Sequence, residues 1–431
     1  MAETTRDTAS SQRLMALARE WDEVVDEIRA LGFEDFLGLP PVGSLLPAAS
    51  GGPVIVLNVS RSRCDALIVT NGGVEPVPLP RLTFEDARQR AIALLAVLKG
   101  VDDGVDELSD AAHDLAEDSP VGRARWLVAT RRLIDARRSA NEELADLQQW
   151  MWQAIAAPVL DHLGLRISPA DGAEWTRVWW CPTGPLAVMP LHAAQDLTAN
   201  PADHAAVIDR VVSSYTPTLR ALQSARAGID PPNPDDRFLV VAIEETDGRP
   251  NLEGALAERD LLRALLTSRR LTVLGESDAS RADVLSSLAK HRWVHFGCHA
   301  DQDLANPSDG GLLLSDGVLT IGEIAGHRFR GDFAGLAACK TAVGGVELLD
   351  ESITLAAALH FTGFRHVVAS LWSIEDNISS TVFEGLYQQL IHEGIMDAER
   401  SSLALHRAIR EQRELFPDEP LDWAPFIHLG P

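Results

Sequence analysis

The sequence contains few cysteines and no long apolar run, and both absences exclude whole classes of protein. Only four cysteines occur in 431 residues, and they lie far apart with no CxxC pair: Cys64, Cys181, Cys298 and Cys339. Neither a zinc cage nor a disulfide framework is therefore expected, and a reduced cytoplasm fits best. No segment approaches the roughly 20 consecutive apolar residues that span a bilayer.

Lysine is almost absent, since Lys99, Lys290 and Lys340 are the only lysines among 38 basic residues. The 63 acidic residues outnumber these bases and give a formal net charge of −25, which repels a phosphate backbone. Nucleic acid is therefore not an expected partner. The first twenty residues lack the apolar core of a secretory signal, so a cytoplasmic location is expected.

The first half of the chain, residues 1–230, combines helices with a few short strands. A β-hairpin is predicted from PVIVLNV and CDALIVT at 53–70, followed by mostly helical sequence over 83–163. RVWWC at 177–181 and LAVMP at 186–190 then suggest a second strand pair. No repeat of roughly 20–50 residues is visible, which excludes a solenoid.

A stretch rich in proline, glycine and acids, AGIDPPNPDD at 227–236, is the predicted boundary between two halves. Beyond it strands alternate with helices: strands at 238–243, 271–274, 292–297, 333–339 and 366–371, and helices at 255–266, 281–288 and 353–361. This alternation predicts an α/β fold over residues 236–431, with a mostly parallel sheet flanked by helices. In such sheets ligands bind beyond the carboxyl ends of the strands.

Two of these strand ends carry side chains that could perform chemistry. His299 follows the apolar run RWVHFG, and Cys339 ends FAGLAAC, so both should face one crevice. An imidazole with a pKa near 6.5 suits the conversion of a thiol to a nucleophilic thiolate. The alternative is that Cys339 is a small buried hydrophobe and His299 a surface residue.

Three histidines are spaced by four residues: His291, His295 and His299. On a helix this spacing would place them on one face as metal ligands. The local sequence favours a strand, along which His295 and His299 would be roughly 13 Å apart. No metal site is therefore expected.

Several motifs in a consistent order resemble the CHAT family of caspase- and separase-like cysteine peptidases. They are HFGCHA (295–300), GLLLSDG (311–317), LTIGEIA (319–325), AACKTA (337–342), ITLAAALHFTGFRHVVASLW (353–372) and WAPFIHLG (423–430). VWWCPTGPLAVMPLHAA (178–194) and NLEGALAERDLL (251–262) are similar to that family as well. The resemblance extends from about residue 10 to residue 431.

The resemblance implies a caspase-like fold in which His299 is the general base and acid and Cys339 the nucleophile. It also implies an oxyanion site made of the backbone N–H groups of Ala300 and Cys339. Many family members have glycine in place of Ala300, and Ser-Ala in place of Ala337 and Ala338. If the turn required a positive φ, Ala300 would be strained by about 1 kcal/mol relative to glycine.

The segment LWSIEDN at 371–377 resembles the stretch where an acid lines the specificity pocket of separases and CHAT proteins. Asp376 is the matching residue, and an acid there would favour Arg or Lys before the scissile bond. The alternative is a helix cap, because Asp376 and Asn377 precede a predicted helix that extends to Leu390.

Together these features predict a cytoplasmic hydrolase, a cysteine endopeptidase that acts on a protein or peptide without a cofactor or metal. The first half lacks a matching His and Cys, so it is expected to be a non-catalytic, caspase-like half. No sensor repeat accompanies the motifs, and activation by a separate partner is therefore expected. Two alternatives remain: a catalytically degenerate CHAT fold that serves as an interaction module, and an acyl hydrolase of small molecules that uses the same pair.

Overall fold

The computed structural model describes most of the chain. The described residues are 17, 19–31, 40–115, 119–170, 172–200, 203, 205–228, 231, 233, 235–246, 249–266, 269–301, 306–337 and 354–431. The chain divides into two compact units, Met1–Pro47 and Ala48–Pro431. In the first unit residues 19–30 are helical and α2 spans Val42–Leu45. Within the described ranges, no helix is both long enough and apolar enough to cross a bilayer.

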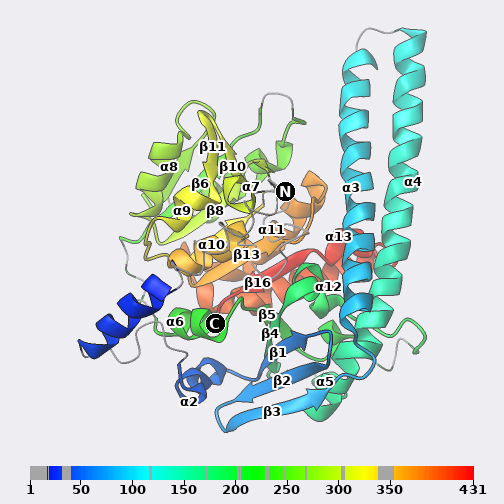
Figure 1. The fold of residues 1–431 in the computed structure, drawn as a ribbon. Helices are drawn as coiled ribbons and strands as arrows, with labels where there is room; N and C mark the ends of the chain where they lie inside the picture. Colours follow the sequence, from blue (N-terminus) through cyan, green and yellow to red (C-terminus); the bar gives the residue numbers. More distant parts are fainter. Residues whose placement is uncertain are drawn as a thin grey trace, which may run out of the picture. The chain divides into compact units, whose positions relative to one another are not determined.

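One sheet of eleven strands forms the centre of the second unit (Figure 1). Sequence before residue 230 contributes β1 (Val54–Val59), β2 (Cys64–Thr70), β3 (Gly73–Pro78), β4 (Arg177–Pro182) and β5 (Val212–Tyr215). Later sequence contributes β6 (Phe238–Ala242), β7 (Leu271–Leu274), β8 (Trp293–Gly297), β12 (Phe333–Leu336), β13 (His366–Ser370) and β16 (Phe426–Leu429). The strand order is β3-β2-β1-β4-β5-β16-β13-β12-β8-β6-β7.

Most neighbouring strands of this sheet are parallel, and helices pack on it. The antiparallel pairs are β1 with β2, β2 with β3, and β13 with β16. The helices of the later sequence are α7 (Glu253–Leu265), α8 (Arg281–Leu288), α9 (Ile321–Ala325), α10 (Leu355–Thr362), α11 (Asp376–Leu390), α12 (Ser401–Leu415) and α13 (Pro420–Trp423). The predicted α/β fold with a mostly parallel, helix-flanked sheet is therefore confirmed.

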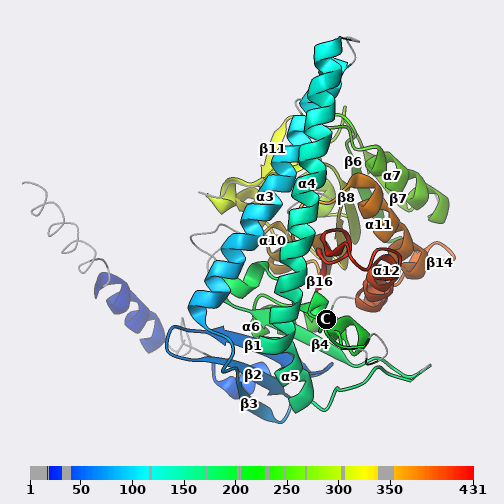
Figure 2. The ribbon, with the colours of Figure 1, turned by 90° about the vertical axis from the view of Figure 1, so that its right-hand side faces the viewer.

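Two long antiparallel helices, α3 (Phe84–Leu115) and α4 (Pro120–Met151), form a hairpin whose tip projects beyond the sheet (Figures 1 and 2). Helix α4 begins at Ser119, whose Oγ accepts a hydrogen bond from Gly122 N, and Pro120 suits the first helical turn. A π-helical turn leads from α4 into α5 (Ala157–His162), where Pro158 has no N–H for a regular helical bond.

In the first half of the chain, one predicted strand is not formed, and two strands are present that were not predicted. The β1–β2 hairpin is confirmed, with Val59 opposite Cys64. LAVMP is not a strand, because Gly184–Val188 forms a 3₁₀ helix. Gly184 has a φ of 55° and Pro185 cannot donate to a strand ladder, so the chain leaves the sheet there. The sequence analysis missed β3, β5 and α6 (Leu219–Arg226).

The last strand, β16, joins the parts of the sheet that come from the two halves of the sequence. It lies between β5 and β13, with Leu429 opposite Tyr215 on one side and opposite Val367 on the other. The Trp179 indole N–H donates to Gly430 O at 2.7 Å, which attaches the end of β16 to β4. One continuous sheet therefore contains strands from residues 1–230 and from residues 236–431. The assignment of a non-catalytic role to the first half and a catalytic role to the second stays a prediction.

Candidate functional site

The strands that lead to His299 and Cys339 are neighbours in the sheet. β8 and β12 run parallel, and their register pairs Phe296 with Leu336. One residue further, Ala337 N donates to Phe296 O at 3.0 Å, so both strands end at the same edge. Cys339 and Ala338 lie outside the described residues. The register therefore agrees with the expected crevice at the carboxyl ends of the strands.

The His299 ring has a defined tautomer. It is half-buried two residues beyond β8, and its Nε2 lies 2.8 Å from Pro250 O. A carbonyl oxygen only accepts, so Nε2 carries the hydrogen and Nδ1 is the basic nitrogen of the neutral ring. Burial lowers the pKa of His299, and the charge of Arg249 acts in the same direction. The ring is thereby kept in the neutral form that a general base requires.

Ala300 begins β9 (Ala300–Asp301), which pairs with β10 (Gly311–Leu314), itself paired with β11 (Gly317–Thr320). Leu313 N donates to His299 O at 2.8 Å, so Ala300 and Leu312 form a non-hydrogen-bonded pair. In such a pair the N–H of Ala300 points away from β10. Among the described residues other than glycine, only Glu393 has a positive φ, so the turn imposes no strain on Ala300.

Asp376 is the first residue of α11, but it does not cap that helix. The N-cap position is Glu375, and no side-chain bond caps it. Asp376 Oδ2 instead accepts a hydrogen bond of 2.5 Å from Gly254 N in the first turn of α7. A Cβ on Gly254 would collide with the Asp376 carboxylate and with Ser380 Oγ, so only glycine fits there. Burial raises the pKa of the Asp376 carboxyl.

His299, Ala300 and Asp376 line one cavity of about 790 Å³. Its opposite wall is one face of α3, from Ile92 to Asp106, and Trp372 and Ser373 complete it near the end of β13. The volume lies within the range of about 300–1,000 Å³ that is typical of ligand sites. The structure thus brings the predicted base, one predicted oxyanion residue and the predicted pocket acid to a common cavity.

The helical hairpin is attached to this cavity by Arg137 of α4. The Arg137 guanidinium binds Glu375 Oε1 at 2.8 Å and both carboxylate oxygens of Asp422 at 2.9 Å. Because Glu375 directly precedes Asp376, this ion pair joins α4 to the start of α11. The sequence offered no signal for this contact, since its partners are separated by more than 200 residues.

His295, the second histidine of the spaced trio, belongs to a buried network that the sequence analysis missed. Its Nε2 lies 2.7 Å from Glu258 Oε2 on α7, and its Nδ1 lies 2.8 Å from the Tyr387 hydroxyl on α11. All three side chains are buried. The network fixes α7 and α11 against β8, and these helices carry Gly254 and Asp376. His291 bonds instead to Ser287 O and Thr272 Oγ1.

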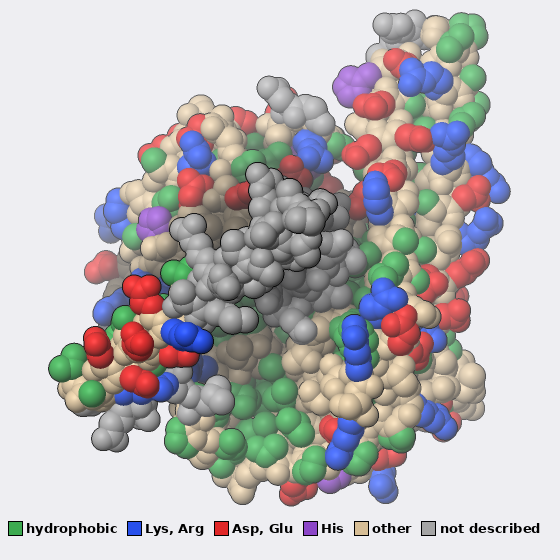
Figure 3. All heavy atoms as spheres, viewed as in Figure 1, with side chains coloured by type: hydrophobic (Ala, Val, Ile, Leu, Met, Phe, Trp, Pro, Cys, Tyr) green, Lys and Arg blue, Asp and Glu red, His purple; other side chains and the backbone are tan. Residues whose placement is uncertain are grey.

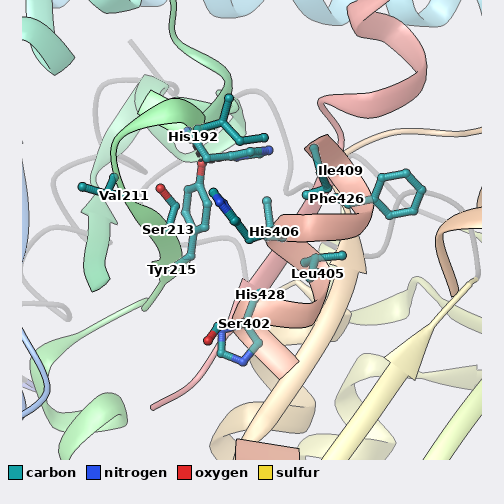
Figure 4. A pocket seen from close by; sticks show the side chains of 12 residues that line it. His192, Val211, Ser213, Tyr215, Ser402, Leu405, His406, Ile409, Phe426 and His428 are labelled. Carbon is teal, nitrogen blue, oxygen red and sulfur yellow. Dashed lines mark hydrogen bonds between the residues drawn. The ribbon is translucent and has the colours of Figure 1, made fainter. Parts of the chain in front are cut away.

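A second, small cavity of about 20 Å³ lies between β5, β16 and α12 (Figure 4). His192 Nδ1 bonds to the Tyr215 hydroxyl at 2.9 Å, and the ring of His406 packs on Trp175. Burial lowers the pKa of His192 and His406 to about 3. Among the described residues, no group of histidine, cysteine and acidic side chains is arranged to hold a metal ion.

Cys298 directly follows β8 and is fully buried. Burial raises the pKa of Cys298 and Cys181 to about 12, so neither thiol ionises near neutral pH. Trp152, Trp179 and Trp180 are buried, whereas Trp126 and Trp150 are half-buried.

Comparisons with known proteins agree with this architecture. The CHAT domain model matches residues 145–431, which is more than half of the chain. Separase in the Saccharomyces cerevisiae separase–securin complex has a similar structure, with a TM-score of 0.56, 11% identity and 90% of the present chain covered. A second structure of that complex gives 0.55 and 9% over the same share, and in both the chain spans 30% of the matched chain.

A complex of the pro- and mature domains of Porphyromonas gingivalis RgpB is a more distant neighbour, with a TM-score of 0.44 and 11% identity. It covers 67% of the present chain and 75% of the matched chain. No curated protein matches the sequence. The fold is similar to that of separase, and the predicted resemblance is confirmed: this chain belongs to the CHAT domain family.

Proposed function

We propose that the chain is a cysteine endopeptidase in which Cys339 and His299 hydrolyse peptide bonds. The observation that carries the proposal is that His299 follows β8, the strand paired with β12, and that Cys339 follows β12 in the sequence. The Nε2–H of His299 is bound to Pro250 O, which leaves Nδ1 as the base. The register of β8 and β12 also supports the proposal, because the residues that follow these two strands leave the sheet at the same edge.

In the proposed reaction His299 Nδ1 takes the thiol proton of Cys339, and the thiolate attacks the scissile carbonyl carbon. The backbone N–H groups of Ala300 and Cys339 hold the oxyanion, and each such donor typically lowers the barrier by about 2.7–4 kcal/mol. The imidazolium then gives its proton to the leaving amine, and a thioester remains. Water, deprotonated by His299, hydrolyses the thioester and releases the acid and Cys339.

The alternative of a degenerate interaction module depended partly on Ala300 in place of glycine. The extended backbone of Ala300 removes that argument, since a side chain there costs nothing in strain. A peptidyl probe with a thiol-reactive group should label Cys339, and a panel of peptide and small-ester substrates should give turnover with peptides only. Turnover of esters without peptides would indicate the acyl hydrolase instead.

Asp376 is proposed to bind Arg or Lys before the scissile bond. Asp376→Asn keeps an oxygen that can accept from Gly254 N at the start of α7, but it removes the negative charge. It therefore distinguishes binding of a substrate cation from a structural role at the end of that helix. We expect kcat/KM for an Arg peptide to fall well over tenfold, because the substrate cation loses its partner, while alkylation of Cys339 by a small uncharged reagent continues. Glu384→Gln, an exposed acid of α11, is the matched control.

The measurement is steady-state cleavage of two peptides that differ only in Arg or Leu before the scissile bond. Equal loss of peptide cleavage and of alkylation would assign Asp376 a structural role. A parent that prefers Leu or Asp at that position would refute the pocket.

A separate protein is proposed to activate the chain. The link from Arg137 to Glu375 gives a route by which a partner on the α3–α4 hairpin could move the pocket acid. Separase, the structural neighbour, was crystallised with securin. We expect the purified chain alone to cleave its best peptide with kcat/KM below about 10⁴ M⁻¹s⁻¹, the low end of typical enzymes. Faster turnover without any partner would contradict this.

A further inference from the structure

The cavity beside His299 is too long for one substrate residue. On α3 its lining extends from Ile92 to Asp106, a distance of about 21 Å at 1.5 Å per helical residue. An extended peptide rises about 3.3 Å per residue, so this wall can accompany about six residues. The proposed base and the proposed pocket acid, His299 and Asp376, line the same cavity. Its dimensions and its position therefore suit an extended peptide rather than a single side chain.

Helix α3 can contact such a peptide only through side chains. The N–H and C=O groups within a helix bond to one another, so they are not available to pair with an added strand. The α3 residues of the lining include six apolar ones: Ile92, Leu95, Ala96, Leu98, Val101 and Val105. In Figure 3 hydrophobic side chains lie between charged ones along the hairpin that contains α3. The wall formed by α3 therefore offers a peptide a substantial apolar surface.

Two of these apolar side chains remain open to the cavity. Ile92 is 43% exposed and Val105 is 38% exposed, whereas Leu98 and Val101 between them are buried in the packing of the hairpin. Contact with an apolar group would remove the exposed surface of Ile92 and Val105 from water, which is favourable. These two positions are therefore the ones at which a ligand residue gains most from being apolar.

The other walls of the cavity present apolar groups to the same space. Leu252, Trp372 and Leu421 belong to its lining together with α3. Leu252 lies two residues beyond Pro250, whose carbonyl oxygen binds His299 Nε2. An apolar side chain that enters the cavity thus meets apolar groups from more than one wall. Because the cavity is continuous with the proposed catalytic histidine, the substrate peptide is the occupant that this arrangement favours.

We propose that α3 is a wall of the substrate groove, and that Ile92 and Val105 select peptides with large apolar residues at positions remote from the scissile bond. This inference rests on the proposed function and names its substrate class: extended segments that combine a basic residue before the scissile bond with Leu, Ile or Phe three or more residues away. The sequence before residue 230, which contains α3, thus contributes directly to specificity.

The test uses the full chain in a Cys339→Ala background and measures peptide binding by fluorescence anisotropy. Two labelled nine-residue peptides have a central Arg and differ only in their two outermost residues at each end, which are Leu in one peptide and Ser in the other. The chain should bind the Leu peptide about ten- to hundredfold more tightly, because each of two half-buried Leu side chains gains about three- to tenfold. Higher salt should leave this preference unchanged, since ionic strength screens only the charged contacts.

The double variant Ile92→Ser/Val105→Ser should reduce the preference for the Leu peptide at least threefold. Its affinity for the Ser peptide should change less than twofold, because the central Arg keeps its proposed partner Asp376. The urea denaturation midpoint of the variant, measured beside that of the parent, checks that the partly exposed positions can be changed without loss of the fold.

Leu127→Ser/Val128→Ser is the matched control, because these exposed apolar residues of α4 lie outside the cavity lining. Equal affinity for the two peptides, binding of neither peptide, or an equal loss of preference in the control would overturn the inference. Because binding is read without turnover, the two proposals fail separately. A preference for the Leu peptide that depends on α3, in a chain that cleaves nothing with Cys339 restored, would refute the peptidase and leave the groove. Cleavage of both peptides without any such preference would refute the apolar selection alone.

Discussion

Replacing His299 by alanine is expected to lower kcat/KM for peptide cleavage by about 10²–10⁴-fold, the usual contribution of a general base. Cys339→Ala is expected to remove cleavage altogether, because it removes the proposed nucleophile, and burial raises the pKa of the Cys181 and Cys298 thiols to about 12. His299 is half-buried beyond the end of β8 and its ring bonds to a loop carbonyl, so its removal should leave the sheet intact. Cleavage rates on a fluorogenic peptide provide the measurement.

Folding is checked separately, by urea denaturation of both variants beside the parent. Midpoints within the error of the parent, together with the loss of cleavage, would support catalytic roles. Full cleavage by Cys339→Ala would show that the nucleophile is another residue. A large drop in the denaturation midpoint of His299→Ala would assign that side chain a structural role.

Acidification is expected to destabilise the protein steeply between pH 6.5 and pH 4. Burial lowers the pKa of His192 and His406 to about 3 and that of His360 to about 4. The unfolded chain binds these protons near pH 6.5, so the stability they contribute is complete above that pH and is lost as the pH falls. At pH 5 the loss is about 2 kcal/mol for each histidine, or about 6 kcal/mol for the three.

Two other groups also change the free energy of unfolding as the pH falls, but acidification remains destabilising. Burial raises the pKa of Asp422 to about 6, so its protonation offsets about 1 kcal/mol of that loss at pH 5. Glu399, whose pKa is lowered to about 2 by the neighbouring His366 and Arg365, loses its contribution only below about pH 4.5. Since domains are stable by about 5–15 kcal/mol in total, a net loss of about 5 kcal/mol by pH 5 removes a large part of the stability.

Urea denaturation at pH 7.5, 6 and 5 tests this expectation. His406→Gln should flatten the pH dependence by about a third, because one of three protons is no longer bound on unfolding. His327→Gln, at an exposed position, is the matched control. A free energy of unfolding that is the same at pH 7.5 and pH 5 would contradict the proposed role of the buried rings.

The second half of the fold was predictable because its elements depend on local sequence. Apolar runs of four to six residues separated by amphipathic helices define β6, β7 and β8 without reference to distant residues. β5 and β16 could not be found in this way, since both have only four residues and VSSY is half polar. Their pairing with each other, over more than 200 residues of sequence, makes them strands.

The candidate site was predictable to a similar extent. His299 was found because it follows a buried strand, and Asp376 because LWSIEDN resembles a segment of the CHAT family. Both residues line the same cavity. The contact of Asp376 with the first turn of α7 was not predictable, because nothing in LWSIEDN indicates that its acid binds another helix. Glu258, His295 and Tyr387 were missed for the same reason, since a buried polar network is defined by contacts between distant segments.

The central position of β16 has a consequence for synthesis of the chain. Until residues 426–429 leave the ribosome, β5 and β13 both present unpaired edges, and such edges are templates for pairing with other chains. Two partial sheets therefore exist in the nascent chain, and they join only at the final strand. Chaperone protection of these edges during translation is the expected requirement, and a nascent chain released before β16 would have an unfinished sheet and a strong tendency to aggregate.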